Sequence, residues 1–228
     1  MTDLQGKNIL VIGASGGLGA PLCRALAAAG ARLTITGRDT RRLQDIGLPE
    51  ATALTAELKD PNVGRTLVDA VIDRHGQLDG VVFAAGVVAF GSAAELDDDV
   101  VDELLLVNYL APLRITRAAL GVLPAGGFVV NISAVVAETP VANMSAYAAS
   151  KSALTAFDAA ARTEARRKKI RIVDARPPHT ETGLATRPIA GVAPKLPTGL
   201  TPESVAARIV SAITDDELDL PSSAFSTG

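Results

Sequence analysis

Short apolar runs alternate with helical segments along this chain, and this alternation constrains the fold more than any other feature of the sequence. Strands are predicted at 8–12, 31–36, within 51–58, and at 80–85, 127–132 and 170–175. Helices are predicted at 20–29, 40–46, 62–74, 97–123 with an interruption near Pro112, and 146–168. This order predicts an α/β fold with a doubly wound parallel sheet and helices on both faces. Ligands of such a sheet bind beyond the carboxyl ends of its strands.

The composition changes after the sixth predicted strand. Six prolines punctuate residues 177–202, and no periodicity is visible until a further helix predicted at 202–213. We interpret residues 180–199 as a lid on the substrate side. The chain has 228 residues, 48% of them hydrophobic, which is enough for one sizeable core. Residues 1–228 are therefore expected to form a single domain.

Hydropathy, cysteine content and net charge exclude several kinds of protein. The longest uncharged apolar run, 80–94, is shorter than the roughly 20 residues of a membrane-spanning helix, so no membrane span is expected. Residues 1–7 lack the apolar stretch of a secretory signal, which predicts a cytoplasmic protein. Cys23 and two histidines provide no ligand cluster, so no metal is expected. A net charge of -3 argues against nucleic acid as a partner, and the basic stretch at 162–171 is interpreted as a solvated helix end.

A glycine-rich loop joins the first predicted strand to the first predicted helix. Residues 13–19 read Gly-Ala-Ser-Gly-Gly-Leu-Gly, and their position between strand and helix makes the pattern a dinucleotide-binding signal. Glycines let a phosphate approach the backbone, and the N-terminus of the helix stabilises the anion. The alternative, a simple tight turn, requires fewer correctly spaced glycines. The cofactor contacts expected here are Gly13, Ser15, Gly17, Leu18 and Gly19.

The residue that follows the second predicted strand decides between two cofactors. This strand end meets the adenosine ribose, where a carboxylate would bind a free 2′-hydroxyl and a guanidinium would bind a 2′-phosphate. Arg38 occupies the position, so NADP(H) is favoured over NAD(H). Asp39 weakens this choice, whereas Arg41 and Arg42 reinforce it. A solvated helix start is the alternative interpretation.

Tyr147 and Lys151 are four residues apart in a predicted helix, so their side chains project from the same face. A nearby ammonium favours the phenolate and would lower the Tyr147 pKa from its usual value of about 10. Ser133 lies just past the strand predicted at 127–132, where its hydroxyl would point into the crevice and bind a substrate oxygen. The Tyr-Lys spacing alone is common by chance.

Taken in this order, the glycine loop, Ser133, Tyr147 and Lys151 resemble the short-chain dehydrogenase/reductase family over nearly the whole chain. The resemblance implies a single-domain Rossmann-type fold. It implies that Tyr147 is the general acid/base, that Ser133 orients the carbonyl or alcohol, and that Lys151 lowers the tyrosine pKa and binds the nicotinamide ribose. It also implies that Asn108 holds a proton-relay water through a helix distortion, with a structural polar residue as the alternative.

The chain departs from the family pattern in three segments. Residues 83–86 read Phe-Ala-Ala-Gly where the family has Asn-Asn-Ala-Gly, and residues 177–178 read Pro-Pro in place of Pro-Gly. Residues 57–58 read Glu-Leu where the family has an aspartate and an aliphatic residue that contact adenine. Thr182 matches a threonine that contacts the nicotinamide carboxamide. By resemblance, the further cofactor contacts are Glu57, Leu58, Ala85, Gly86, Tyr147, Lys151, Pro177 and Thr182.

These features favour an NADP(H)-dependent oxidoreductase that transfers hydride between the nicotinamide and a small-molecule carbonyl or alcohol. The resemblance implies a homodimer or homotetramer formed through helices such as 97–123 and 146–168. The altered segments at 83–85 and 177–178 leave open a non-catalytic NAD(P)-binding sensor or scaffold with the same fold. An epimerase using the same Tyr-Lys pair fits less well, because such enzymes carry a large C-terminal substrate domain.

Overall fold

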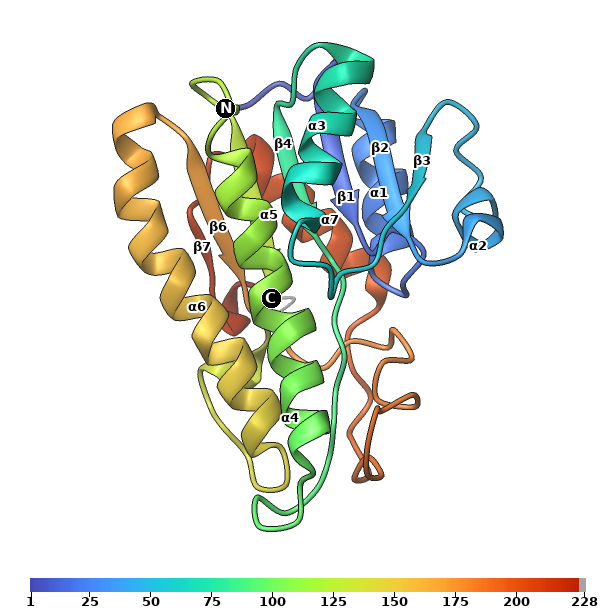
Figure 1. Ribbon diagram of the computed structural model, residues 1–228, viewed down its shortest axis with the longest axis vertical. Helices are drawn as coiled ribbons and strands as arrows, with labels where there is room; N and C mark the ends of the chain where they lie inside the picture. The colour runs from blue at the N-terminus through green and yellow to red at the C-terminus, as the bar shows by residue number, and fades with distance from the viewer. Residues whose placement is uncertain (226–228) are drawn as a thin grey trace.

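Seven parallel strands form one sheet in the computed structural model, which describes residues 1–225 (Figure 1). The strand order is β3-β2-β1-β4-β5-β6-β7. The strands are β1 (Asn8–Ile12), β2 (Arg32–Gly37), β3 (Thr52–Thr55), β4 (Gly80–Phe83), β5 (Phe128–Ile132), β6 (Arg171–Ala175) and β7 (Asp219–Leu220). The order reverses between β1 and β4, so the point where a doubly wound sheet binds its ligand lies between these two strands. The predicted α/β fold is confirmed.

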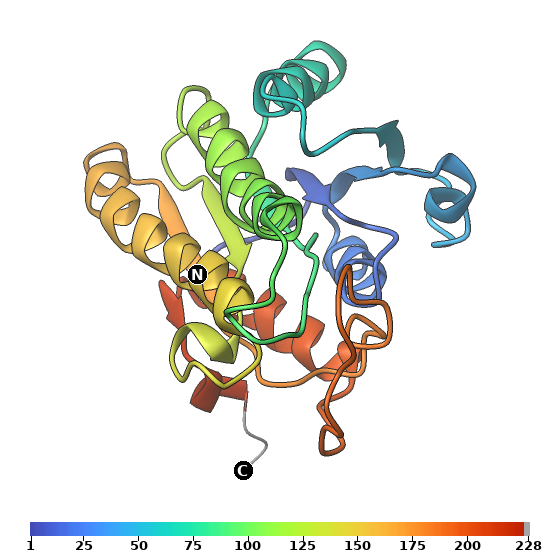
Figure 2. The ribbon, with the colours of Figure 1, turned by 60° about the horizontal axis from the view of Figure 1, so that its bottom comes forward.

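Helices cover both faces of the sheet (Figure 2). Helices α1 and α7 pack on one face, and α3, α5 and α6 pack on the other. The helices are α1 (Gly19–Ala28), α2 (Thr40–Gln44), α3 (Val63–His75), α4 (Asp98–Leu105), α5 (Ala111–Ala119), α6 (Ser145–Ala165) and α7 (Pro202–Thr214). Short 3-10 turns occur at Val135–Ala137, Arg166–Lys168 and Ser222–Phe225.

The central strand β1 shows why a uniformly apolar sequence suits a sheet covered on both faces. All five of its residues are buried. Successive side chains of a strand point to opposite faces. Accordingly, Ile9 and Val11 pack with α1 and α7, whereas Leu10 and Ile12 pack with α3 and α5. Each face therefore has its own apolar core, and both cores depend on the same strand.

The helix predicted at 97–123 is two helices joined by a π-helical turn. Helix α4 ends at Leu105, the π-helix spans Leu106–Leu110, and α5 begins at Ala111. The interruption was expected near Pro112 and begins six residues earlier. A π-turn holds an extra residue, which redirects a side chain, and π-turns occur often at functional sites. Asn108 lies in this turn and is fully buried.

The seventh strand was not predicted from the sequence. Asp219 pairs with Asp174 and Leu220 pairs with Ala175, so β7 extends the sheet beyond β6 by two residues only. A run this short contains no readable periodicity, and it is fixed by tertiary contacts. Its carboxylate at Asp219 forms ion pairs with Arg176 and Arg162.

Residues 180–199, which the sequence predicts to be a lid, form a loop without helix or strand. An isolated bridge between Thr180 and Leu200 closes the base of the loop. Another bridge joins Ala190 to Ala89, in the segment that follows β4. The loop therefore packs against the residues that leave the centre of the sheet. Within residues 1–225, no helix has both the length and the apolar character needed to cross a membrane.

Candidate active site

The glycine loop lies where the carboxyl ends of β1 and β4 meet. Gly13 has a φ of +77°, and a Cβ added to it would lie 2.7 Å from the amide nitrogen of Ala85. A Cβ on Gly17 would clash with the carbonyl oxygen of Thr182, and one on Gly19 would clash with the carbonyl oxygen of Gly13. The loop is thus packed backbone against backbone, which only glycine permits. The structure brings Ala85 and Thr182, both predicted from the sequence as cofactor contacts, to this loop.

The same loop has the features that a pyrophosphate group requires. Helix α1 begins at Gly19 and points its positive dipole end at the loop. In the described part of the chain, the amides of Ser15, Gly17 and Leu18 donate no backbone or side-chain hydrogen bond. Free amides at a helix N-terminus bind anions. The loop therefore fits the phosphates of a dinucleotide.

Two guanidinium groups stand near the end of β2, beside the glycine loop. Arg38 is exposed and forms no hydrogen bond or ion pair with any other residue of the described chain. Arg42 donates from Nη2 to the carbonyl oxygen of Ser15 at 3.1 Å. The carboxylate of Asp39 caps α2, accepting from the amides of Arg41 and Arg42. Asp39 is therefore occupied by the helix, and the two arginines form a basic corner that fits a phosphate.

The segment after β3 lies next to this corner. The amide of Ala56 donates to the carbonyl oxygen of Gly37, the last residue of β2. Glu57 is exposed, and its carboxylate accepts from the amide of Lys59. Leu58 packs against the apolar core on the α3 and α5 side. The structure thus brings the predicted adenine contacts Glu57 and Leu58 to the edge of the same crevice.

Lys151, Asn108 and Gly86 come together on the other side of the crevice. The ammonium of Lys151 donates to the carbonyl oxygen of Ile132 at 2.9 Å. Asn108 accepts from the amide of Val87 at 3.0 Å and donates to the Val87 carbonyl at 2.9 Å. A Cβ on Gly86 would lie 3.3 Å from Asn108 Oδ1 and 3.6 Å from Lys151 Nζ. The π-turn therefore joins the end of β4 to α6.

Burial dominates the ionisation of Tyr147 and Lys151. It raises the pKa of Tyr147 to about 12 and lowers the pKa of Lys151 to about 8. The expected lowering of the tyrosine pKa by Lys151 is thus absent from the structure without ligands. The reason is that removal from water penalises the phenolate more than the ammonium stabilises it. At neutral pH the phenol keeps its proton, and Lys151 is mostly charged.

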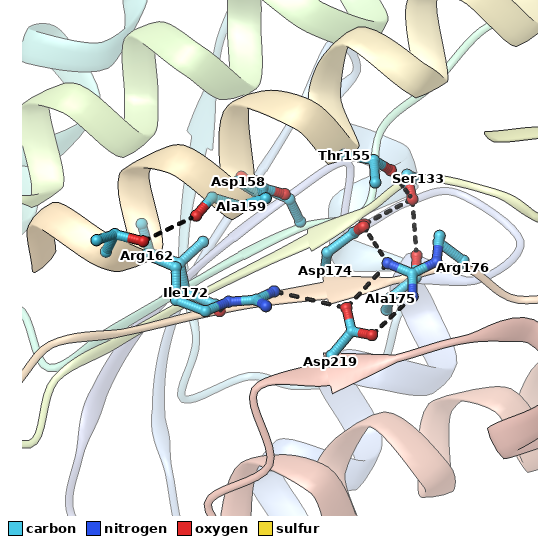
Figure 3. A network of polar contacts seen from close by, with 12 residues as sticks. Ser133, Thr155, Asp158, Ala159, Arg162, Ile172, Asp174, Ala175, Arg176 and Asp219 are labelled. Atoms are coloured by element: carbon cyan, nitrogen blue, oxygen red, sulfur yellow. Dashed lines mark hydrogen bonds and ion pairs between the residues drawn. The ribbon is translucent and has the colours of Figure 1, made fainter. Parts of the chain in front are cut away.

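The predicted orientation of Ser133 is wrong. Its hydroxyl donates to Asp174 Oδ1 at 2.6 Å and accepts from Thr155 at 3.2 Å, in a buried polar layer under α6 (Figure 3). The next residue, Ala134, packs in the apolar cluster that contains Tyr147. Side chains at neighbouring positions of an extended segment point to opposite sides. The side chain on the Tyr147 side is therefore that of Ala134.

An apolar cluster surrounds the Tyr147 side chain. Its buried members are Val88, Ala89, Phe90, Leu104, Val136, Tyr147 and Ala148. Leu184 and Ile189 from the 180–199 loop pack against it, as does Ala134. The loop also bonds to the segment after β4, where the amide of Ile189 donates to the Val88 carbonyl. The phenol is therefore enclosed by aliphatic and aromatic side chains.

The segment after β6 connects this cluster to the glycine loop. The carbonyl oxygen of Pro177 accepts from the amide of Val135, two residues beyond Ser133. Thr182, five residues later, packs its backbone on Gly17. The predicted contacts Pro177 and Thr182 thus lie between the turn after β5 and the glycine loop. Among residues 1–225, no three His, Cys, Asp or Glu side chains are grouped so that they could hold a metal ion.

Comparisons with known proteins agree with this arrangement. Residues 7–190 match the family described as short chain dehydrogenase. Dehydrogenase/reductase SDR family member 7B of Danio rerio is 30% identical over 242 residues, covering 96% of this chain and 77% of that protein. The cyclic-di-GMP-binding biofilm dispersal mediator protein of Escherichia coli is 37% identical over 155 residues, covering 68% of this chain and 65% of that protein.

A solved structure supports the same relationship in three dimensions. The crystal structure of a short chain dehydrogenase from Burkholderia cenocepacia in complex with NADP is 29% identical and has a TM-score of 0.86, covering 99% of this chain and 100% of that chain. The family match covers most of the chain, and the glycine loop and Lys151 meet at one end of the sheet. The chain therefore belongs to the short-chain dehydrogenase/reductase family.

Proposed function

We propose that this protein is an NADP(H)-dependent oxidoreductase that transfers hydride between the nicotinamide and a carbonyl or alcohol substrate, with Tyr147 as the general acid/base. The observation that carries the proposal is the grouping of Lys151 on α6, Asn108 in the π-turn and Gly86 after the end of β4, with the buried Tyr147 one helical turn before Lys151. When bound, the cofactor supplies or accepts the hydride. The chain supplies the alignment and the proton.

The protonated phenol fits the direction of carbonyl reduction. With its pKa raised to about 12 by burial, Tyr147 holds a proton at neutral pH that it can donate to a substrate oxygen. The Lys151 ammonium would bind the ribose and favour the phenolate formed by that donation. Ala134 offers no hydroxyl on the crevice side, so orientation of the substrate oxygen falls to Tyr147.

The basic corner at the end of β2 supports NADP(H) over NAD(H). Arg38 and Arg42 lie there, and the Asp39 carboxylate is used in capping α2. The similar Burkholderia cenocepacia structure is a complex with NADP. A guanidinium pair recognises a 2′-phosphate through charge-assisted hydrogen bonds that a 2′-hydroxyl cannot form.

Tyr147→Phe tests the proposed chemistry. The chain has no tryptophan, so NADPH fluorescence can be followed against little protein background. The apolar surroundings of Tyr147 direct the screen to aliphatic and aromatic ketones without charged groups. Loss of a general acid is expected to lower kcat by at least about 100-fold.

Tyr109→Phe is the matched control for this test, because Tyr109 is the other tyrosine of the chain and lies in the π-turn. The control should reduce the same ketone at close to the wild-type rate. Full turnover by Tyr147→Phe would show that another group donates the proton.

A non-catalytic NAD(P)-binding sensor or scaffold is the second candidate. Two observations favour it: Ala134 stands on the crevice side, and residues 83–85 lack the amide side chains usual in the family. The similar Escherichia coli protein is described as cyclic-di-GMP-binding. Tight NADPH binding without reduction of any ketone in the screen would support this candidate, and calorimetry with cyclic-di-GMP would test that ligand directly.

Assembly into a homodimer or homotetramer is also proposed, through the helices α4 to α6, on the family resemblance. Light scattering coupled to size-exclusion chromatography measures the mass of the particle in solution, and a mass of one chain would contradict the proposal.

A further inference from the structure

A buried ion network lies under α6, directly behind the strand residue that binds Lys151. Asp174 is only 1% exposed, and one of its carboxylate oxygens accepts from Ser133 at 2.6 Å. The other accepts from Arg176, which also pairs with Asp219 (Figure 3). Arg176 pairs with Glu138 as well. The network thus spans β5, β6, β7 and the turn after β5. None of these residues has a role in the reaction proposed above, and the Ser133 hydroxyl, expected from the sequence to bind substrate, faces Asp174 instead.

The network comes close to the Lys151 ammonium through β5. Lys151 donates to the carbonyl of Ile132, and the next residue, Ser133, binds Asp174. One helical turn after Lys151, Thr155 donates to the same Ser133 hydroxyl. The ammonium and the carboxylate therefore lie on either side of a single peptide of β5. Both groups are buried, so water screens their attraction only weakly.

The other groups around Lys151 do not supply its negative partner. From α6 come the neutral phenol of Tyr147, the Arg162 cation and Asp158, whose pKa burial raises well above its usual value and whose charged form burial therefore disfavours. The π-turn contributes the neutral Asn108. Beyond Asp174, the network adds Arg176 from β6, Glu138 from the turn after β5, and Asp219 from β7. Glu138 and Asp219 are bound to Arg176, and Asp219 lies at the exposed edge.

We propose that Asp174 is a positioning residue of the active site, whose carboxylate, fixed by Ser133 and Arg176, keeps the buried Lys151 ammonium charged. Burial by itself favours the neutral amine, and the nearby carboxylate opposes this. The proposal rests on the proposed function, because a charged Lys151 is useful only if Tyr147 must release a proton. It gives Ser133 a role on the far side of the strand, where it holds Asp174.

Asp174→Asn tests the proposal, since the amide keeps the shape and an acceptor for Ser133 but removes the charge. The full-length chain contains six lysines, so labelling lysine with carbon-13 at Cε gives few signals, and Lys151→Arg identifies the one that belongs to Lys151. The titration midpoint of Lys151 is expected near pH 8 in the wild type. In Asp174→Asn it should fall by about one pH unit.

Asp219→Asn is the matched control. It removes another partner of Arg176 and loosens the same network, but its carboxylate is at the exposed edge and does not act on Lys151. Its midpoint should equal that of the wild type. Equal shifts in both variants would assign the effect to loss of rigidity and overturn the proposal, as would an unchanged midpoint in Asp174→Asn.

Arg176→Gln gives a second test with the opposite sign, which remains informative if Asp174→Asn does not fold. Removing the cation beside Asp174 leaves its negative charge less compensated, so the Lys151 midpoint should rise. A fall or no change would contradict the proposal.

The pH dependence of NADPH-dependent ketone reduction tests the positioning role of Asp174. In Asp174→Asn the rate should begin to fall at a lower alkaline pH than in the wild type, by the same amount as the Lys151 midpoint falls. An unchanged pH profile would refute the positioning role. If even the wild type reduces no ketone, the proposed function fails, while the Lys151 titration still decides the charge link.

Discussion

Arg38 and Asp39 are neighbours in the sequence, and the fold uses their opposite charges for different purposes. Asp39 accepts two backbone amides at the start of α2, so its charge stabilises a helix terminus. Arg38 has no partner among the described residues and stays available to a ligand. The proposed cofactor preference therefore rests on single residues, and on which of the two charges is already satisfied within the fold.

Replacing Arg38 by alanine is expected to weaken NADPH binding and to leave NADH binding nearly unchanged. Loss of charge-assisted hydrogen bonds to a 2′-phosphate should raise the Kd for NADPH about 10- to 100-fold. Fluorescence titration with both nucleotides measures this. Arg65→Ala, an exposed arginine on α3, is the control and should bind both as the wild type does. An equal loss for NADH and NADPH would remove Arg38 from 2′-phosphate recognition.

At the scale of an element, the π-turn Leu106–Leu110 is held by one side chain. Asn108 bonds to both backbone groups of Val87 and donates to Ser150 at 3.1 Å. Ser150 in turn donates to the carbonyl of Tyr147 at 2.7 Å. A single amide thus connects the end of β4, the π-turn and the first turns of α6, which carry Tyr147 and Lys151.

Asn108→Ala is expected to destabilise the fold, because it leaves the part-buried amide and carbonyl of Val87 without their Asn108 partner. Each such group costs about 1–3 kcal/mol, so the free energy of unfolding should fall by about 2 kcal/mol or more. Urea denaturation followed by circular dichroism checks this. Asn62→Ala, at the start of α3 where the side chain makes no capping bond, should change stability little. An equal loss of unfolding free energy in both variants would mean that the hydrogen bonds of Asn108 make no specific contribution to stability.

Across the whole molecule, ion pairs hold the segment that follows α7 to the rest of the fold. Arg176, the residue after β6, binds Asp219 of β7, and Arg208 of α7 binds Glu217. Hydrogen bonds from these arginines lower the pKa of both Asp219 and Glu217. The folded chain therefore holds these carboxyls ionised more strongly than the unfolded chain does.

The sign of this effect predicts acid sensitivity. A carboxyl whose pKa is lower in the folded state contributes stability above its unfolded pKa of about 4, and this stability is lost as the pH falls through the folded value. Stability measured by urea denaturation should thus decline below about pH 4. Asp219→Asn should make the decline shallower, whereas Asp69→Asn, on the exposed side of α3, should reproduce the wild-type curve. If the free energy of unfolding fell equally steeply with pH in the wild type, Asp219→Asn and Asp69→Asn, this account would be contradicted.

Local patterns in the sequence were sufficient to predict six of the seven strands and to single out the glycine loop and the Tyr-Lys pair. The apolar runs predicted β1, β4, β5 and β6 within two residues, because strands covered on both faces must be apolar throughout. The glycine spacing predicted a backbone that a ligand can approach, and the packing of Gly13 and Gly17 agrees. In each case the information lies within a few neighbouring residues.

Only the tertiary structure decided what depends on burial and on distant partners. Ser133 faces Asp174 because β6 and Arg176 lie behind it, and the spacing from Tyr147 does not reveal this. The raised pKa of Tyr147 follows from the apolar cluster built by the 180–199 loop and the segment after β4. Strand β7 and the π-turn likewise exist through contacts with residues remote in the chain. The periodicity of the sequence shows which side chains are apolar. The direction in which a polar side chain points, its removal from water and its pairing with an opposite charge arise only when separate elements of the fold come together.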